Sequence, residues 1–142
     1  MTKKRRLLFA VLAVTLTLVV SVAGLFALDI YEHHKLSTSA GLNVWGYRGP
    51  TVGRKQAGEL RVLALGGSTT FGYGVHWQEA VPAYLEGLLK QQNAIPGHPV
   101  TVVNLGYNGE GAHSYKYTLQ DYEYLNGDAV IFYTGYNDFS TN

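Results

Sequence analysis

The sequence predicts an α/β domain with a parallel sheet, preceded by one hydrophobic helix near the N-terminus. Three short apolar runs alternate with segments of helical spacing, and a polar loop containing glycine follows each run. Strand–helix–strand order with right-handed crossovers gives a parallel sheet, whose ligands bind outside the carboxyl ends of the strands. An uncharged apolar stretch, residues 7–28, precedes all of this.

Composition limits the size of the protein and its classes of partner. The 142 residues suffice for one modest domain, and the apolar content of 46% is normal for a globular chain. Because there is no cysteine, disulfides, thiolate metal sites and a cysteine nucleophile are excluded. Four of the 11 basic residues lie in residues 3–6, which leaves seven basic against ten acidic side chains, or −3, in the remainder. We therefore expect no nucleic-acid partner.

Residues 7–28 are predicted to anchor the chain in the inner membrane. As a helix they would span about 33 Å, enough for a bilayer core of about 30 Å. The basic tail, residues 1–6, places the N-terminus in the cytoplasm and the rest in the periplasm or outside the cell, as a single-pass protein. A cleaved signal peptide is the alternative, because Ser21–Ala23 fits a cleavage site before Gly24. We favour the anchor, because the apolar run continues to Leu28.

Residues 29–58 have the composition of a juxtamembrane connector, and the domain is predicted to occupy residues 59–142. The adjacent His33 and His34 do not share a face of a helix or strand, so no metal site is expected there. Strands are predicted at Leu60–Leu65, Val100–Leu105 and Ala129–Tyr133.

Two helices are predicted between these strands. The first is opened by Pro82 and has four apolar residues on one side, namely Tyr84, Leu85, Leu88 and Leu89. The second covers Ser114–Leu125 and has three residues on one face, namely Tyr115, Leu119 and Tyr122. The loops Gly66–Thr70, Gly106–Gly111 and Gly135–Asp138 then lie together at the carboxyl edge of the sheet.

These loops contain the groups that ester hydrolysis by a serine requires. Ser68 stands where a strand gives way to a turn, which exposes its hydroxyl. The N–H groups of Ser68 and Gly109 and the side-chain amide of Asn137 are candidate oxyanion donors. One such donor stabilises a transition state by about 3–4 kcal/mol.

Spacing argues against two other uses of the first loop. The nucleophile elbow of the α/β-hydrolases needs Gly-x-Ser-x-Gly, but Thr70 occupies the final glycine position. Gly67 and Gly72 have the spacing of the two glycines of a phosphate-binding loop, but Tyr73 stands where such a loop has its lysine. Taken alone, this loop would be read as a structural turn.

Taken together, the three loops resemble the blocks of the SGNH hydrolases, also called GDSL-type esterases. Gly66-Gly67-Ser68 resembles the first block, whose serine is nucleophile and oxyanion donor. Asn104–Gly109 resembles the second, whose glycine N–H lies in the oxyanion hole; we assign this role to Gly109, with Gly106 in reserve. Gly135–Asp138 resembles the third, in which Asn137 completes the hole. The likeness covers about Glu59 to Asp138.

The resemblance implies a three-layer, flavodoxin-like fold with a sheet of about five parallel strands. It also implies hydrolysis of an ester, or removal of an acyl group from a carbohydrate. We expect no metal and no cofactor. The segment Gly46–Gly49 resembles the lead-in of membrane-anchored bacterial members. Gly67 departs from the aspartate of the Gly-Asp-Ser pattern.

The resemblance also implies a catalytic base, a histidine in a late Asp-x-x-His block, that this chain does not contain. Asn142 ends the chain four residues after Asp138, and all five histidines lie upstream. His113 opens a predicted helix, a position more typical of a surface residue, so it is not assigned as the base. We therefore expect an N-terminal portion of a longer enzyme, ending in an unprotected edge strand, marginally stable and with little or no esterase activity.

The residues of the three loops are compatible with more than one class of substrate. Tyr73, Tyr107 and Tyr136 lie in the three loops and could stack on sugars or merely cover the loop bases. We expect an acyl-ester substrate, either a glycan or a lipid of the envelope or the extracellular space. The alternatives are a non-catalytic glycan-binding or assembly module and an O-acyltransferase.

Overall fold

The computed structural model describes residues 2–139, which divide into two compact units, one ending at Leu36 and the other beginning at Ser37. Helix α1, Lys3–Ala40, accounts for the first unit and is long and apolar enough to cross a membrane. It extends through residues 29–40, which the sequence suggested were connector. No glycine or proline interrupts those residues, and the helix ends at Gly41, whose φ of +68° is left-handed.

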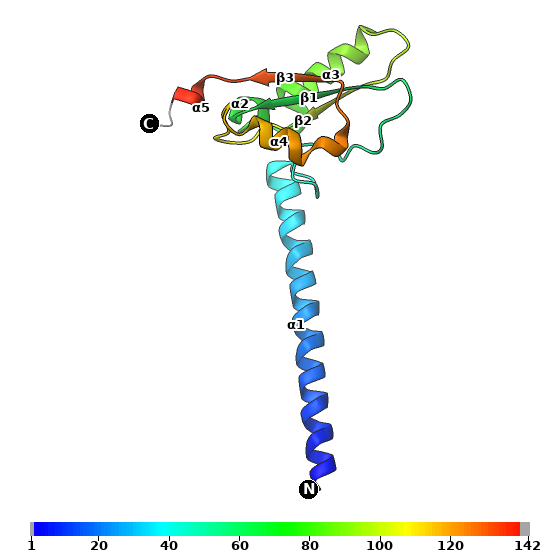
Figure 1. Ribbon diagram of the computed structural model, residues 1–142, viewed down its shortest axis with the longest axis vertical. Helices are drawn as coiled ribbons and strands as arrows, with labels where there is room; N and C mark the ends of the chain where they lie inside the picture. Colours follow the sequence, from blue (N-terminus) through cyan, green and yellow to red (C-terminus); the bar gives the residue numbers. More distant parts are fainter. Residues whose placement is uncertain (1, 140–142) are drawn as a thin grey trace. The chain divides into compact units, whose positions relative to one another are not determined.

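The second unit is built on a sheet of three parallel strands, β1 Leu60–Gly66, β2 Val100–Asn104 and β3 Ala129–Tyr133 (Figure 1). The strand order is β2-β1-β3, so β1 is central and hydrogen-bonds to both neighbours. The predicted α/β class is confirmed, and the strand bounds agree with the prediction to within one residue.

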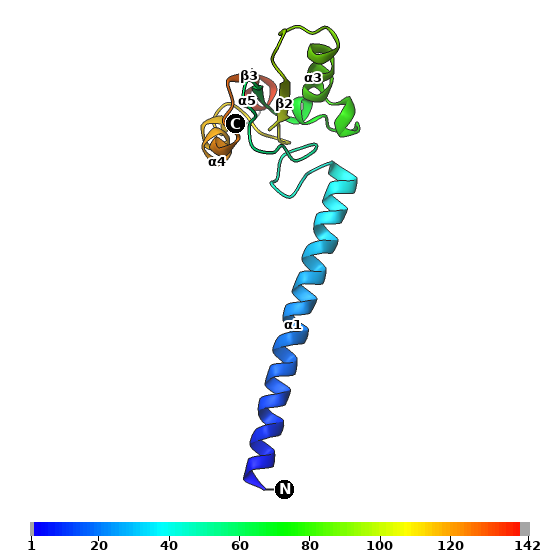
Figure 2. The same cartoon turned by 90° about the vertical axis from the view of Figure 1, so that its right-hand side faces the viewer.

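Helices cover the two faces of the sheet and give the domain three layers. Helix α3, Val81–Gln91, lies on one side, and α4, Tyr115–Asp121, lies on the other (Figure 2). On the α4 side, Leu63 and Leu65 pack with Tyr115 and with Leu125 of the short 3-10 helix η2, Glu123–Leu125. On the α3 side, the buried residues are Val62, Ala64, Val100 and Val102, with Leu85 and Leu89 packed against them.

Two details of the helices differ from the prediction. Tyr84 is 65% exposed and does not share the packed side of α3 with Leu85 and Leu89. The predicted helix at Ser114–Leu125 is divided into α4 and η2, separated at Tyr122. The core contacts predicted for Tyr115, Leu119 and Tyr122 are present.

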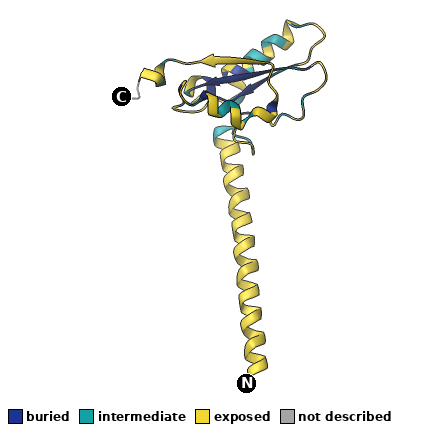
Figure 3. Cartoon of the chain, viewed as in Figure 1, coloured by how far each residue is buried: buried dark blue, intermediate teal, exposed yellow. Residues whose placement is uncertain are grey.

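Strand β3 differs from β1 in its exposure to solvent (Figure 3). Every residue of β3 is exposed, whereas all of β1 except Leu60 is buried. The large apolar side chains on this edge include Val130, Ile131 and Phe132. Phe132 stacks on Tyr115, with ring centroids 5.4 Å apart.

Candidate functional site

Ser68 is the first residue of a short helix, α2 Ser68–Phe71, that follows β1 directly. The sequence suggested an open turn here, but Gly67 is extended and Gly72, with φ of +82°, ends a four-residue helix. Ser68 is exposed, and none of the residues 2–139 hydrogen-bonds to its hydroxyl in the structure. The hydroxyl is therefore presented to solvent at the carboxyl edge of the sheet.

The two glycines before Ser68 have no side chain, which allows α2 and the third loop to lie close to the backbone at these positions. A Cβ added at Gly66 would lie 2.0 Å from Oγ1 of Thr70, in α2. A Cβ added at Gly67 would lie 2.2 Å from Nδ2 of Asn137, in the third loop. The Asn137 amide therefore fills the space that a side chain at position 67 would need, which gives a physical reason for the glycine there.

The third loop forms helix α5, Tyr136–Phe139, and hydrogen-bonds to the second loop and to the residue that follows it. Nδ2 of Asn137 donates to the carbonyl oxygen of Glu110, at 2.7 Å. Oδ1 of Asp138 accepts from the Ala112 N–H at 2.7 Å, and Oδ2 accepts from the Gly135 N–H at 3.0 Å and from the Thr134 hydroxyl. The hydrogen bonds from Thr134 and Ala112 lower the pKa of Asp138 from its usual value, so this carboxylate is ionised near neutral pH.

The second loop contains the two glycines considered as oxyanion donors. The N–H of Gly106 is buried and donates to Oδ1 of Asn104 at 3.0 Å. Gly109 has a φ of +80°, is exposed, and its N–H has no acceptor within the described part of the chain. Of the two, only Gly109 has an N–H that is available to a ligand.

The predicted site residues are distributed over three cavities. Ser68, Asn137 and Tyr136 line a cleft of about 80 Å³ together with Glu110. Gly109 and Tyr107 line a second cavity, of about 460 Å³, which also includes Glu110. Tyr73 lines a third, also of about 460 Å³. The structure thus brings Ser68 and Asn137 together, but the three tyrosines do not form a common wall.

No histidine lines the Ser68 cleft among residues 2–139. His113 is exposed and lines the second cavity instead. Within the same residues, no three side chains of His, Asp or Glu gather as a metal site would require. The described lining of the cleft thus supplies a hydroxyl and an amide but no imidazole.

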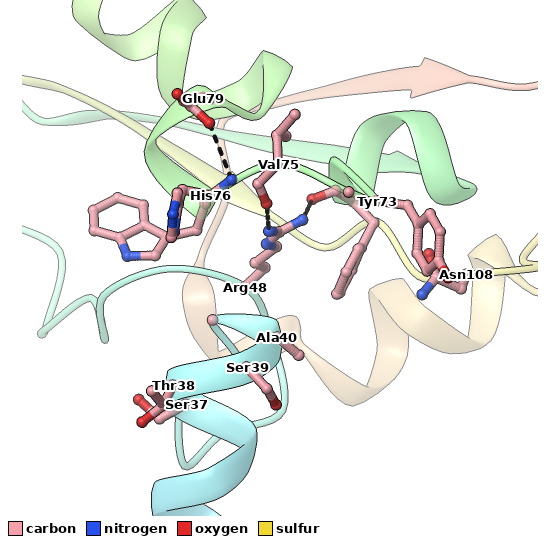
Figure 4. A pocket seen from close by; sticks show the side chains of 14 residues that line it. Ser37, Thr38, Ser39, Ala40, Arg48, Tyr73, Val75, His76, Glu79 and Asn108 are labelled. Carbon is pink, nitrogen blue, oxygen red and sulfur yellow. Dashed lines mark hydrogen bonds between the residues drawn. The ribbon is translucent and has the colours of Figure 1, made fainter.

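Arg48 and Asn104 support the serine-bearing helix, and the sequence did not indicate this role. The buried Arg48 guanidinium donates to the carbonyl oxygens of Phe71 and Gly72 and lies 4.3 Å from the centroid of the Phe71 ring. It also donates to the carbonyl oxygen of Val75 (Figure 4). Nδ2 of Asn104 donates to the carbonyl oxygens of Thr70, at 3.0 Å, and Phe71, at 3.3 Å.

The backbone joins these two supporting residues, because the N–H of Arg48 donates to the carbonyl oxygen of Asn104 at 3.1 Å. Burial lowers the pKa of the Arg48 guanidinium, and its Nε has no partner in the described chain. The only signal in the sequence was an arginine within the glycine-rich stretch Gly46–Gly49, which does not reveal what the side chain would contact.

Comparison with known proteins finds no matching family model and no matching curated protein. Among solved structures, the chain is similar to AlinE4, described as an SGNH-hydrolase family esterase, and to its D162A mutant. Each match has 26% sequence identity and a TM-score of 0.45. Each covers 59% of this chain and 44% of the esterase, so the matched region spans less than half of that enzyme.

Proposed function

We propose that the second unit belongs to a serine esterase in which Ser68 is the nucleophile. The observation that carries this proposal is the position of the Ser68 hydroxyl, exposed at the start of α2 and in one cleft with the Asn137 amide. Serine attack requires a hydroxyl accessible to an ester carbonyl and donors positioned for the oxyanion. The Ser68 N–H, the Asn137 amide and the available N–H of Gly109 are the donors we assign.

The reaction would proceed through an acyl-enzyme. Oγ of Ser68 bonds to the ester carbonyl carbon while its proton passes to a base, and the carbonyl oxygen becomes an oxyanion. When this tetrahedral species collapses, the bond to the alcohol oxygen breaks and that oxygen takes up the proton. Water then attacks the acyl-serine in the same way, releasing the acid and restoring Ser68.

The proton acceptor is what the described cleft lacks, so we propose that the 142-residue chain hydrolyses esters slowly. Imidazole added in solution can take the place of a missing histidine side chain. We expect hydrolysis of p-nitrophenyl acetate that depends on Ser68 to increase with imidazole concentration. The quantity to measure is the rate of the unsubstituted chain minus the rate of Ser68→Ala at each concentration, because imidazole also cleaves this ester directly.

A second variant tests the oxyanion hole. Asn137→Ala should reduce the Ser68-dependent rate by about 100-fold, as loss of one oxyanion donor does in serine hydrolases. If Ser68→Ala hydrolyses the ester as fast as the unsubstituted chain at every imidazole concentration, the esterase proposal is wrong. The absence of a histidine from the described cleft would then favour the second candidate, a non-catalytic binding module.

We further propose that residues 7–28 anchor the protein in the inner membrane with the N-terminus in the cytoplasm. The helix has the required length and hydropathy, and the basic residues 3–6 precede the apolar stretch. Alkaline phosphatase fused to the C-terminus should be active, because this enzyme works only outside the cytoplasm.

A substrate in the envelope or outside the cell follows from this orientation. Product analysis with acceptor sugars would separate hydrolysis from acyl transfer.

A further inference from the structure

The second cavity, beside α4, is a built pocket, and of its lining residues the proposed chemistry uses only Gly109 among residues 2–139. Its volume of about 460 Å³ lies within the range of roughly 300–1,000 Å³ typical of small-ligand sites. Aromatic rings and polar side chains line it together, among them Tyr107, Tyr122, Asn108, Glu110, His113 and Thr118. Glu110 connects this cavity to the Ser68 cleft, because it lines both.

An aromatic shelf, defined as Trp45, Tyr122 and Tyr124, adjoins the cavity through Tyr122. The ring centroids of Trp45 and Tyr124 are 5.7 Å apart, and those of Tyr122 and Tyr124 are 6.0 Å apart. Trp45 is 59% exposed and Tyr124 is 55% exposed, so both rings offer surface to a ligand. The Tyr122 hydroxyl donates to the carbonyl oxygen of Trp45 at 3.0 Å, which links the two segments that carry the shelf.

The polar side of the cavity is also held in place. Oε1 of Glu110 accepts hydrogen bonds from the hydroxyls of Ser114, at 3.1 Å, and Thr118. Oε2 of Glu110 accepts none from residues 2–139. This oxygen is available to a donor on a ligand, and the Asn108 amide and the His113 ring are further hydrogen-bonding groups in the lining.

The combination of aromatic rings and polar groups around the second cavity favours some classes of ligand over others. Among residues 2–139, no lysine or arginine lines the cavity, and the chain beyond residue 6 has a net charge of −3, so an anionic ligand or a nucleic acid would find no counter-charge there. A lipid chain would leave the carboxylate and the amide without partners. A neutral sugar offers apolar C–H faces for the rings and hydroxyls for the polar groups.

We propose that the cavity and the aromatic shelf bind a neutral sugar unit of the substrate, adjacent to the ester that Ser68 attacks. This inference rests on the proposed function, and it narrows the substrate class from acyl esters of a glycan or a lipid to acylated neutral glycans. An extended glycan would pass Glu110, with its acyl group in the Ser68 cleft and a neighbouring ring in the cavity.

The test is a binding measurement that does not depend on catalysis. The full chain in detergent micelles is titrated with cellotetraose and with chitotetraose by calorimetry, and tetragalacturonate is the anionic comparison. Saturation-transfer NMR then reports which sugar protons contact the protein. We expect at least one neutral tetrasaccharide to bind, and Trp45→Ala and Tyr124→Ala each to weaken binding by about tenfold. Tyr84→Ala, which removes a similarly exposed tyrosine from α3, should leave binding unchanged.

Several results would overturn the inference. These are no binding of either neutral sugar at millimolar concentration, tighter binding of tetragalacturonate, or equal affinities of the shelf variants and the unsubstituted chain. Quenching of Trp45 fluorescence by brominated lipid, measured with Trp77→Phe, would instead assign the shelf to the membrane surface. Ser68→Ala should retain sugar binding, so failure of the esterase proposal and failure of this one give different results.

Discussion

At the scale of single residues, Gly67 shows how the absence of a side chain shapes the site. A Cβ there would lie 2.2 Å from Nδ2 of Asn137, so Gly67→Ala must displace that amide and weaken its hydrogen bond to Glu110. We expect the Ser68-dependent, imidazole-stimulated rate to fall by tenfold or more, on the order of one lost oxyanion donor. We expect the free energy of unfolding to fall by only about 1 kcal/mol.

The matched control is Gly87→Ala, in helix α3, where an added Cβ has no neighbour within 4 Å. This change should raise the free energy of unfolding by up to about 1 kcal/mol, because alanine is the better helix former, and leave the ester rate unchanged. Equal ester rates for Gly67→Ala and the unsubstituted chain would show that the Asn137 amide takes no part in the reaction.

Glu59 makes the stability of the domain depend on pH. Burial alone would raise the pKa of this carboxyl, but hydrogen bonds from Arg61 and from the Gln56 N–H, with the charge of Arg61, lower it overall. A carboxyl whose pKa is lowered by folding stabilises the folded state above its unfolded pKa, and the effect is lost as pH falls through the folded pKa.

Urea unfolding should therefore show Glu59→Gln to be about 3 kcal/mol less stable at pH 7, because Arg61 is left buried without its anion. The difference should shrink as pH falls below the unfolded pKa of about 4.3, where the carboxyl of the unfolded chain takes up a proton, and should be lost as pH falls through the lowered pKa of the folded state. A difference that stays constant down to pH 2 would exclude the ionised pair as the cause.

At the scale of elements, helix α2 is held by contacts from distant parts of the chain. The Arg48 guanidinium donates to the carbonyl oxygens of Phe71, the last residue of α2, and of Gly72, which caps it, so Arg48→Met should lower the free energy of unfolding by about 3 kcal/mol and Arg48→Lys by less. Amide hydrogen exchange at Phe71 and Gly72 should accelerate in both variants. Arg54→Met, which removes an exposed arginine, is the control and should change neither quantity.

The same helix shows what could be predicted from the sequence and what could not. The strands were predictable because each is a short apolar run followed by glycine or polar residues. The proximity of Ser68 and Asn137 was predictable because their loops follow neighbouring strands, and their catalytic roles stay predictions. Helix α2 was not, because four residues with two threonines have weak helical propensity. It depends on Arg48, 20 or more residues away, and no spacing in the sequence reports such a contact.

At the scale of the whole molecule, the second unit combines a buried central strand with an exposed edge. Strands β1 and β2 are covered by helices, but β3 presents Val130, Ile131 and Phe132 to solvent and, within residues 2–139, has a partner strand on one side only. An exposed apolar strand edge is a template for pairing with another chain. The exposed edge adds a risk of association to the low stability that we expect from the sequence.

This exposure predicts that the 142-residue chain associates through β3. In detergent micelles, light scattering should increase with protein concentration and with heating, and Ile131→Lys should reduce it several-fold, since a charge opposes strand pairing at an edge. Tyr84→Lys adds the same charge on the exposed side of α3 and should scatter like the unsubstituted chain, which separates a local effect from one of net charge. If the two lysine variants scatter light equally, association does not occur through β3. The apolar side chains of that strand are then exposed to water without causing association.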